Sequence, residues 1–254
     1  MLAGAGELES VILEQHQLVS EGMKKIPVPE GWALPGAQRT CKLVIGEWGN
    51  WHRPDRSSKA LWQQCTMRDA LTSALTLDIL HRNADKVSIA CAAQTVNVLN
   101  SALLTFNDAT IRTPNFHVYK MYMPHRNAQV LPCSVDSKML YSGVTDVFGI
   151  HSFASLKDGI VTVNVVNASY ADAQDVTLEF DKPTHFLSVQ QLGGIDPTAH
   201  NTPGAPNMVA VHLGEAPQKK EGGIVCTFLR RLSTFINSRS IDNKQSLRMV
   251  SGDK

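Results

Sequence analysis

The chain has 254 residues, enough for one large domain or two of ordinary size. Hydrophobic residues make up 43% of it and charged residues 19%, which is the composition of a folded protein with a buried core. Twenty-four Lys and Arg residues oppose 23 Asp and Glu residues, and this net charge of +1 argues against a general nucleic-acid binder.

The start of the chain, residues 1–7, has neither the basic segment nor the long apolar run of a signal peptide. No stretch approaches the ~18 consecutive apolar residues of a membrane span, so no membrane partner is expected. The five cysteines (41, 65, 91, 133 and 226) are scattered and form no Cys-x-x-Cys pair. This pattern favours buried free thiols in a reducing compartment, and a cytoplasmic location is the expectation.

The first half alternates helices with short apolar strands, and Pro and Gly mark a loop at 27–36. Helices are predicted over 7–23, 61–83 and 115–123, and strands over 41–45 and 86–91. Such alternation is typical of βαβ units with a parallel sheet.

The second predicted helix has an apolar stripe of five residues: Leu71, Ala74, Leu75, Ile79 and Leu80. Asp78 and Arg82 lie one turn apart and are expected to form a weak surface pair.

The second half has the two-residue alternation of half-exposed strands, with turn residues such as Asp158-Gly159 between them. Strands are predicted over 160–166, 176–180, 186–190 and 208–213. Short strands at this spacing indicate an antiparallel sandwich.

Glu47 lies just beyond the carboxyl end of the first strand, which is the edge where ligands bind in parallel α/β folds. Trp48 and Trp51 flank it, and flat aromatic faces beside a carboxylate suit a sugar. A packing role for both tryptophans and a structural salt bridge for Glu47 remain the alternative.

Gln94 and Asn97 follow the second strand and are expected at the same sheet edge as Glu47, where amides could bond sugar hydroxyls. The alternative is a pair of amides that tie down a loop.

Other site classes lack support. The histidines form no His-x-x-x-His arrangement, so no metal site is expected. Neither a glycine-rich nucleotide loop nor a Gly-x-Ser-x-Gly elbow is present, and no cofactor is expected.

Three segments resemble the C-terminal part of family 51 α-L-arabinofuranosidases, a family of glycoside hydrolases. They are Gly46-Glu-Trp-Gly-Asn-Trp51, Gln63-Gln-Cys-Thr-Met-Arg-Asp-Ala-Leu71 and Gln94-Thr-Val-Asn-Val-Leu99. The likeness runs in collinear order from about residue 5 to residue 213.

The resemblance implies an α/β plus all-β fold, in which the C-terminal portion of a (β/α)₈ TIM barrel precedes an antiparallel β-sandwich. It implies that Glu47 is the catalytic nucleophile, that Gln94 contacts the arabinofuranosyl unit and that Trp51 lines the side of the leaving sugar. Trp48 is expected to be a packing residue.

Two features depart from the family pattern. Gly46 stands where the family usually has Asp, so the hydrogen bonds and the charge of a neighbouring carboxylate are lost beside Glu47. Retaining hydrolysis also needs a second carboxyl about 5 Å from the nucleophile. The family supplies it from an Asn-Glu pair, and this sequence contains no Asn-Glu dipeptide.

The length agrees with a partial barrel. A complete barrel takes about 250 residues, so residues 1–125 suffice only for strands 7 and 8 with their helices, and residues 126–254 form the sandwich with a divergent polar tail. We expect a C-terminal fragment of a longer enzyme, inactive alone. Residues 126–213 are expected to resist protease better than the barrel remnant.

By this resemblance the parent removes terminal α-L-arabinofuranosyl groups from arabinan, arabinoxylan or their oligosaccharides. The expected partner is an arabinose-containing saccharide, and a homo-oligomer of the full-length parent stays open. The competing function is a non-catalytic carbohydrate-binding or assembly module.

The C-terminal segment departs from the family's closing strand. Apolar residues at helical spacing predict an amphipathic helix over 226–237, docked on the sandwich, followed by a disordered tail over 238–254.

Overall fold

The structure is a computed structural model, and it describes residues 2–28, 31, 41–52, 61–141, 146–169, 173–181, 184–193, 196–220, 223–228, 232–240 and 246–251. Most of the predicted loop at 27–36 lies outside these residues. No helix in this part of the chain is long and apolar enough to cross a membrane.

In the described residues of the first half, three α-helices and two parallel strands follow one another in the predicted order. In chain order the elements are α1 (Leu2–Lys25), β1 (Leu43–Trp48), α2 (Met67–Arg82), β2 (Val87–Ala92), the hairpin strands β3 (Leu103–Phe106) and β4 (Ala109–Arg112), α3 (Pro114–Met121) and a 3₁₀ turn (Met123–His125). β1 pairs with β2 in parallel register, so the predicted parallel pair is confirmed.

α2 begins six residues later than the periodicity predicts. Thr66 is its N-cap, and Asp69 completes a capping box by bonding back to the Thr66 backbone. The sequence contains this Thr-x-x-Asp signal, which the apolar periodicity alone does not locate.

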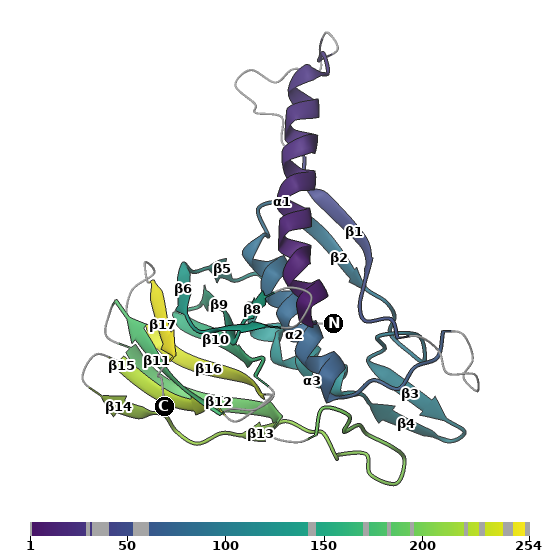
Figure 1. The fold of residues 1–254 in the computed structure, drawn as a ribbon, viewed down its shortest axis with the longest axis vertical. Helices are drawn as coiled ribbons and strands as arrows, with labels where there is room; N and C mark the ends of the chain where they lie inside the picture. Colours follow the sequence, from purple (N-terminus) through teal and green to yellow (C-terminus); the bar gives the residue numbers. More distant parts are fainter. Residues whose placement is uncertain are drawn as a thin grey trace.

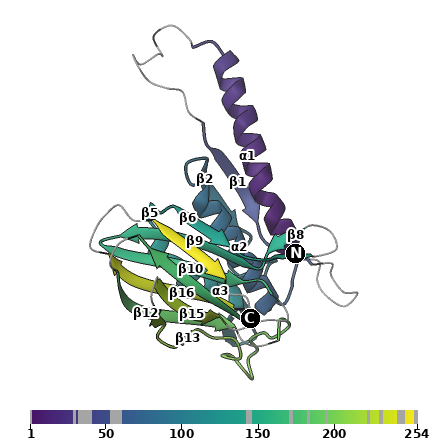
Figure 2. The same ribbon diagram turned by 60° about the vertical axis from the view of Figure 1, so that its left-hand side comes forward.

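In its described residues the second half contains two large sheets and one two-stranded sheet. Its strands are β5 (Gln129–Val130), β6 (Cys133–Asp136), β7 (Met139–Tyr141), β8 (Asp146–Phe148), β9 (Ile150–Lys157), β10 (Ile160–Asn167), β11 (Gln174–Phe180), β12 (Thr184–Gly193), β13 (His212–Leu213), β14 (Gln218–Lys220), β15 (Gly223–Phe228), β16 (Leu232–Ser240) and β17 (Leu247–Ser251). One sheet has the order β13-β12-β16-β10-β9-β5 and the other β14-β15-β11-β17-β6 (Figures 1 and 2), while β7 and β8 pair separately.

A shared core lies between these sheets. Val161, Val163 and Val165 of β10 pack with Val176 of β11 and Met249 of β17, and all five are fully buried. Among the described residues of this half, β6 and β17 pair in parallel and all other strand pairs are antiparallel.

The predicted strands are confirmed over 160–166, 176–180 and 186–190. The prediction over 208–213 is wrong for its first four residues, because only His212 and Leu213 pair with β12. β10 is also not half-exposed: it is buried on both faces from Val161 to Asn167, because α2 covers the face turned away from the second sheet.

The helix predicted over 226–237 is wrong. β15 occupies 223–228 and β16 occupies 232–240, where it fills the space between β10 and β12. The predicted disorder over 238–254 is also wrong for β17, whose Leu247 and Met249 are buried. Residues 241–245 and 252–254 of that tail lie outside the described residues.

α2 and α3 lie between the β1–β2 pair and the sheets of the second half (Figure 1). Met67, Leu71 and Leu75 of α2 form one buried cluster with Val118 of α3 and Leu192 of β12. The division near residue 125 stays a prediction, and side-chain packing crosses it.

Asp78 and Arg82 do not form the expected surface pair. Asp78 is fully buried and accepts hydrogen bonds from the Tyr122 hydroxyl and Asn164 Nδ2, each at 2.6 Å. Arg82 Nη2 instead lies 3.1 Å from Glu9 Oε2 of α1.

The expectation of buried thiols is confirmed only for Cys65. Cys133 is half-buried, whereas Cys41 and Cys91 are exposed, and all four are free. Cys91 is exposed because the β1–β2 pair has little cover on one side, and the side chain of Cys226 lies outside the described residues.

Candidate functional site

Glu47 and Gln94 lie at the same edge of the β1–β2 sheet. The strands are parallel, Trp48 is level with Ala92, and the Ala93 N–H donates to the Trp48 carbonyl at 2.9 Å. Glu47 is the next-to-last residue of β1, whereas the predicted strand over 41–45 ends before it. Gln94 is two residues past the end of β2. Both side chains are exposed.

An irregularity in β1 accounts for the exposure of Glu47. The pairing register shifts between Ile45 and Trp48, and both of these residues pack against the cluster around Ile12 and Ile79. Glu47 lies between them and is exposed, so its carboxylate is accessible to solvent. At Gly46, where the family usually has Asp, a side chain would meet nothing within 4 Å.

The two tryptophans beside Glu47 differ in environment. Trp48 meets Tyr119 edge-to-face, with ring centroids 6.1 Å apart, as expected for a packing residue. Trp51 is 66% exposed, so its ring is free to stack against a ligand.

Asp69 at the start of α2 holds the loop that carries Trp51. Its Oδ1 accepts from Asn50 Nδ2 at 3.1 Å and lies 2.6 Å from His52 Nε2. Its Oδ2 accepts from the Thr66 N–H at 2.8 Å, and the carboxylate is completely buried. Asp69 therefore links the loop after β1 to the N-terminus of α2.

Gln63 holds the same loop through two further hydrogen bonds. Its Oε1 accepts from the His52 N–H at 3.1 Å, and its Nε2 donates to the Asn50 carbonyl at 2.8 Å. Sequence reasoning missed the roles of Asp69, His52 and Gln63. The capping signal at Thr66 and Asp69 indicates a helix start, but the partners in the loop follow only from the fold.

The loop after β2 is held in the same way. Asn97 Nδ2 donates to Thr105 Oγ1 at 2.6 Å, and Asn97 Oδ1 accepts from the Thr105 N–H at 2.8 Å. For Asn97 the loop-tying alternative is therefore confirmed. Gln94 lies on this fixed loop and follows a cis peptide bond from Ala93.

A buried polar cluster lies beneath both loops. Asn100 Nδ2 donates to Ser73 Oγ at 3.1 Å and to the Tyr119 hydroxyl at 3.0 Å, while its Oδ1 accepts from Asn115 Nδ2 at 3.0 Å. Burial raises the pKa of Tyr119 to about 12, so its hydroxyl keeps its proton at neutral pH. These hydrogen bonds hold in place the buried residues that support the ends of β1 and β2, close to Glu47 and Gln94.

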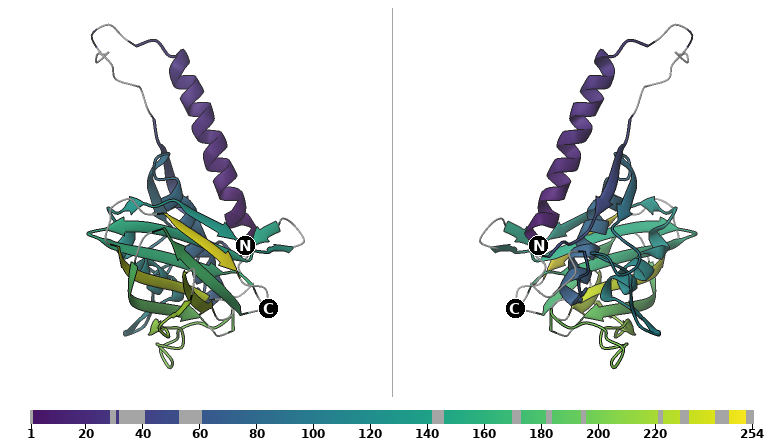
Figure 3. Two further views of the ribbon diagram at one scale, coloured as in Figure 1. Left: turned by 90° about the vertical axis from the view of Figure 1, so that its left-hand side faces the viewer. Right: turned by 90° about the vertical axis from the view of Figure 1, so that its right-hand side faces the viewer.

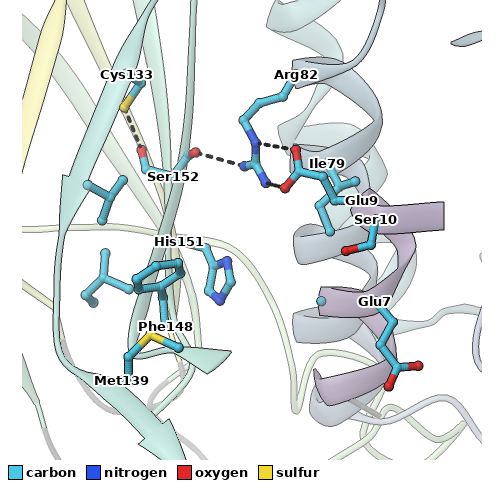
Figure 4. A pocket seen from close by; sticks show the side chains of 13 residues that line it. Glu7, Glu9, Ser10, Ile79, Arg82, Cys133, Met139, Phe148, His151 and Ser152 are labelled. Carbon is cyan, nitrogen blue, oxygen red and sulfur yellow. Dashed lines mark hydrogen bonds and ion pairs between the residues drawn. The ribbon is translucent and has the colours of Figure 1, made fainter. Parts of the chain in front are cut away.

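A cavity of about 440 Å³ lies elsewhere, between α1, α2 and strands β6–β9 (Figure 4). Glu9 and Arg82 pair across it, and His151 faces it from β9. Burial raises the pKa of Glu9, but the hydrogen bonds and charge of Arg82 outweigh that effect and lower it. The lining includes no residue of the loops after β1 and β2, so the cavity is separate from the strand-end site.

No group of three or more His, Cys, Asp or Glu side chains that could hold a metal ion occurs among the residues that the structure describes.

Comparison with known proteins decides the family. Residues 46–233 match the family model of the alpha-L-arabinofuranosidase C-terminal domain. The chain belongs to this family. The resemblance stated from the sequence is thereby confirmed.

Two curated relatives illustrate the match. An intracellular exo-alpha-L-arabinofuranosidase of Bacteroides ovatus is 36% identical over 140 residues, which are 54% of this chain and 27% of the relative. A probable alpha-L-arabinofuranosidase C of Aspergillus niger is 30% identical over 172 residues, 63% of this chain and 33% of the relative. The chain thus covers about a quarter to a third of these relatives.

Solved structures agree. The GH51 arabinofuranosidase of Xanthomonas axonopodis pv. citri superposes with a TM-score of 0.70 and 27% identity, covering 78% of this chain and 41% of that one. The family 51 enzyme AbfB of Bifidobacterium longum reaches a TM-score of 0.72 over 93% of this chain and 47% of its own. At 16% identity the second match shows the fold alone.

Proposed function

We propose that this chain is the nucleophile-bearing, C-terminal part of a retaining α-L-arabinofuranosidase, with Glu47 as the nucleophile. In this proposal β1 and β2 are strands 7 and 8 of a (β/α)₈ barrel, and the two sheets of the second half are the β-sandwich. The observation that carries it is that Glu47 and Gln94 are both exposed at the carboxyl edge of two parallel strands, where barrel enzymes keep their catalytic groups.

The proposed chemistry is a double displacement. The Glu47 carboxylate attacks the anomeric carbon of a terminal arabinofuranosyl unit and forms a glycosyl ester, while the glycosidic carbon–oxygen bond breaks and its electrons pass to the leaving oxygen. That oxygen takes a proton from a separate carboxylic acid, which as its carboxylate then activates the water that cleaves the ester. Gln94 bonds a hydroxyl of the sugar, and the exposed Trp51 ring stacks on the leaving group.

The carboxyl of Asp69 is unsuited to the acid role. It is completely buried and already engaged by Asn50, His52 and Thr66. Because no Asn-Glu dipeptide is present either, the acid belongs to a part of the enzyme outside this chain, and the 254 residues alone are expected to be inactive.

Turnover of a chromogenic aryl α-L-arabinofuranoside tests the proposal. The chain alone should show none, since a missing acid/base costs ~10²–10⁴-fold. A hybrid in which the preceding part of the Bacteroides ovatus relative is joined ahead of β1 should be active.

Within that hybrid Glu47→Ala should abolish turnover, and added azide should restore release of the phenol by attacking the anomeric carbon in place of the carboxylate. Glu215→Ala, an exposed glutamate far along the chain, is the matched control and should keep full activity. Retained turnover in Glu47→Ala contradicts the nucleophile assignment, and robust turnover by the 254 residues alone contradicts the inactivity.

A non-catalytic carbohydrate-binding module is the second candidate, favoured by the 66% exposure of Trp51. Binding of arabino-oligosaccharides that Trp51→Ala abolishes, together with an inactive hybrid, supports this candidate over hydrolysis.

Terminal arabinofuranosyl groups of arabinan, arabinoxylan or their oligosaccharides are the proposed substrates. The free thiols of the four described cysteines suit a reducing compartment, and a cytoplasmic location is proposed on that ground.

A further inference from the structure

The exposed Trp51 lies between two residues that are turned inward. Asn50 is 9% exposed and the His52 side chain is 23% exposed, against 66% for Trp51. Gln63 fixes the backbone on both sides of Trp51, because it accepts from the His52 N–H and donates to the Asn50 carbonyl. The direction of the indole ring therefore depends on how firmly residues 50 and 52 are held.

The side chains of Asn50 and His52 meet at one oxygen of the Asp69 carboxylate. Oδ1 accepts from Asn50 Nδ2 at 3.1 Å and lies 2.6 Å from His52 Nε2. A carboxylate oxygen only accepts, so this ring nitrogen carries the proton and donates it. Arg68 Nη2, which lies 3.3 Å from the same nitrogen, is the other polar group at this contact. The hydrogen bond from His52 is short and charge-assisted, and its acceptor is completely buried, which makes it a strong one.

The second oxygen of Asp69 serves the helix. Oδ2 accepts from the Thr66 N–H at 2.8 Å and from the Thr66 hydroxyl at 2.9 Å. Four donors thus converge on a group that can only accept, and an asparagine would turn an NH₂ group toward two of them. The start of α2 requires only the two bonds to Thr66. The two bonds to the loop exceed what the helix needs, and they point to a role in the loop.

We propose that Asp69 and His52 are positioning residues for Trp51, and that through it they set the affinity for the leaving saccharide. A ring that is already in place when the sugar arrives avoids the free-energy cost of ordering it during binding. The inference rests on the proposed function in that it takes Trp51 as the residue that meets the leaving group. It adds which buried residues of this chain determine that contact.

The affinity for arabinotriose, whose leaving group is itself a saccharide, provides the test. In the hybrid enzyme, His52→Ala and Asp69→Asn should each raise the KM for arabinotriose about three- to tenfold and leave kcat within about twofold. Inhibition by L-arabinose, which fills only the position of the arabinofuranosyl unit, should be unchanged. His52→Gln should restore most of the affinity, because its amide can donate to the Asp69 carboxylate.

A double substitution separates positioning from general damage to the fold. If His52 acts through Trp51, His52→Ala should not raise the KM of a Trp51→Ala enzyme any further. Thr113→Ala is the matched control. Thr113 is the buried N-cap of α3, so its loss also weakens the start of a helix, but its hydroxyl contacts Ser101 and Phe116 instead of the loop. This variant should keep the wild-type KM.

Hydrogen exchange observes the loop directly in the 254-residue chain, without any turnover. The amide at position 52 is protected by Gln63 Oε1. His52→Ala and Asp69→Asn should speed its exchange about tenfold or more, because a hydrogen bond to a charged group is lost. Thr113→Ala should leave the rate unchanged. If Asp69→Asn does not fold, His52→Ala decides the result alone.

The outcomes separate this inference from the proposed function. Unchanged exchange at position 52 in His52→Ala overturns the inference, and so does a wild-type KM in that variant or a further rise in KM in the double substitution. An inactive hybrid contradicts the proposed function, and the affinity is then measured as the Kd of arabinotriose for the 254-residue chain by calorimetry. Weaker binding in His52→Ala that disappears in the Trp51→Ala background supports the inference, and the absence of that weakening overturns it.

Discussion

Gly49 fixes the path of the chain between Glu47 and Trp51. Its φ of +151° lies in a region that side-chain-bearing residues rarely adopt, and a Cβ at this position would lie 2.7 Å from Asn100 Cβ. Asn100 cannot retreat easily, because it is fully buried and bonded to Ser73, Tyr119 and Asn115. The glycine is thus required by both backbone conformation and space.

Gly49→Ala should lower the free energy of unfolding by about 1–3 kcal/mol, because alanine would have a strained φ and its methyl group would clash with Asn100 Cβ. Chemical denaturation measures the change. Gly46→Ala, three residues earlier in β1, is the control and should cost little, since nothing lies within 4 Å of the added methyl. Equal losses in the two variants would show that the contact with Asn100 has no special cost.

Asp78 is a buried carboxyl group with an unusual proton affinity. Burial raises its pKa from 3.8 to about 7, against the hydrogen bonds of Tyr122 and Asn164 and the charge of Arg82, which lower it. Because the folded state then holds the proton more tightly than the unfolded state, the contribution of Asp78 to stability falls as the pH rises from about 4 to about 7.

Asp78→Asn removes this titration. The free energy of unfolding of the variant minus that of the wild type should therefore rise between pH 4 and pH 7, by at most about 1.4 kcal/mol per pH unit, and level off above pH 7. Urea denaturation across this range measures it. Asp85→Asn, an exposed carboxyl paired with Lys86, should give no such rise. A flat difference for Asp78→Asn would mean that the buried carboxyl does not hold its proton.

At the scale of elements, β16 joins parts of the chain that are far apart in sequence. Ile236 is level with Val163 of β10 on one side and with Val189 of β12 on the other. Without β16 both neighbours would have open edges in the middle of the sheet. Its central position, which the sequence does not disclose, outweighs the helical spacing of its apolar residues.

Ile236→Pro should lower the free energy of unfolding by about 3 kcal/mol or more, because proline deletes a backbone donor inside a central strand. Leu187→Pro in β12 is the matched control, since Leu187 sits at the irregularity in the β12–β16 ladder, where proline is better tolerated. Thermal unfolding of the two variants compares them, and equal stability would contradict the central role of β16. Slow hydrogen exchange over 233–239 in the wild type is a second expected result.

The contrast between local and distant pairing explains which elements the sequence predicts. β1, α2 and β2 follow one another, so the same sheet edge for Glu47 and Gln94 follows from strand periodicity and parallel pairing alone. β17 pairs with β6, and Leu247 of β17 is level with Cys133 of β6 although the two residues are far apart in the sequence. No local sequence pattern predicts that contact. The hydrogen bonds of Asp69 cannot be predicted from the sequence for the same reason, because its partners Asn50 and His52 come from a separate loop.

At the scale of the whole molecule, α2 is the element that unites the two halves. Twelve of its sixteen residues are buried, and it packs against α1, α3, β9 and β10. The protected region expected from the sequence, 126–213, therefore has to be extended to include α2 and α3. α1 and β1 lie outside that core and are joined to it mainly by the cluster around Ile12 and by the pair of Glu9 with Arg82.

Limited trypsin digestion should accordingly cut first after Lys24 and Lys25, which end α1 where the helix extends beyond the rest of the molecule (Figure 3). Lys157 is the internal comparison: it is also exposed, but it precedes a tight turn in which Asp158 and Gly159 both have positive φ, and it is held between two paired strands. Mass spectrometry of the earliest fragments gives the order of cleavage. Cleavage after Lys157 before or together with Lys24 and Lys25 would show that α1 is as firmly packed as the sheets.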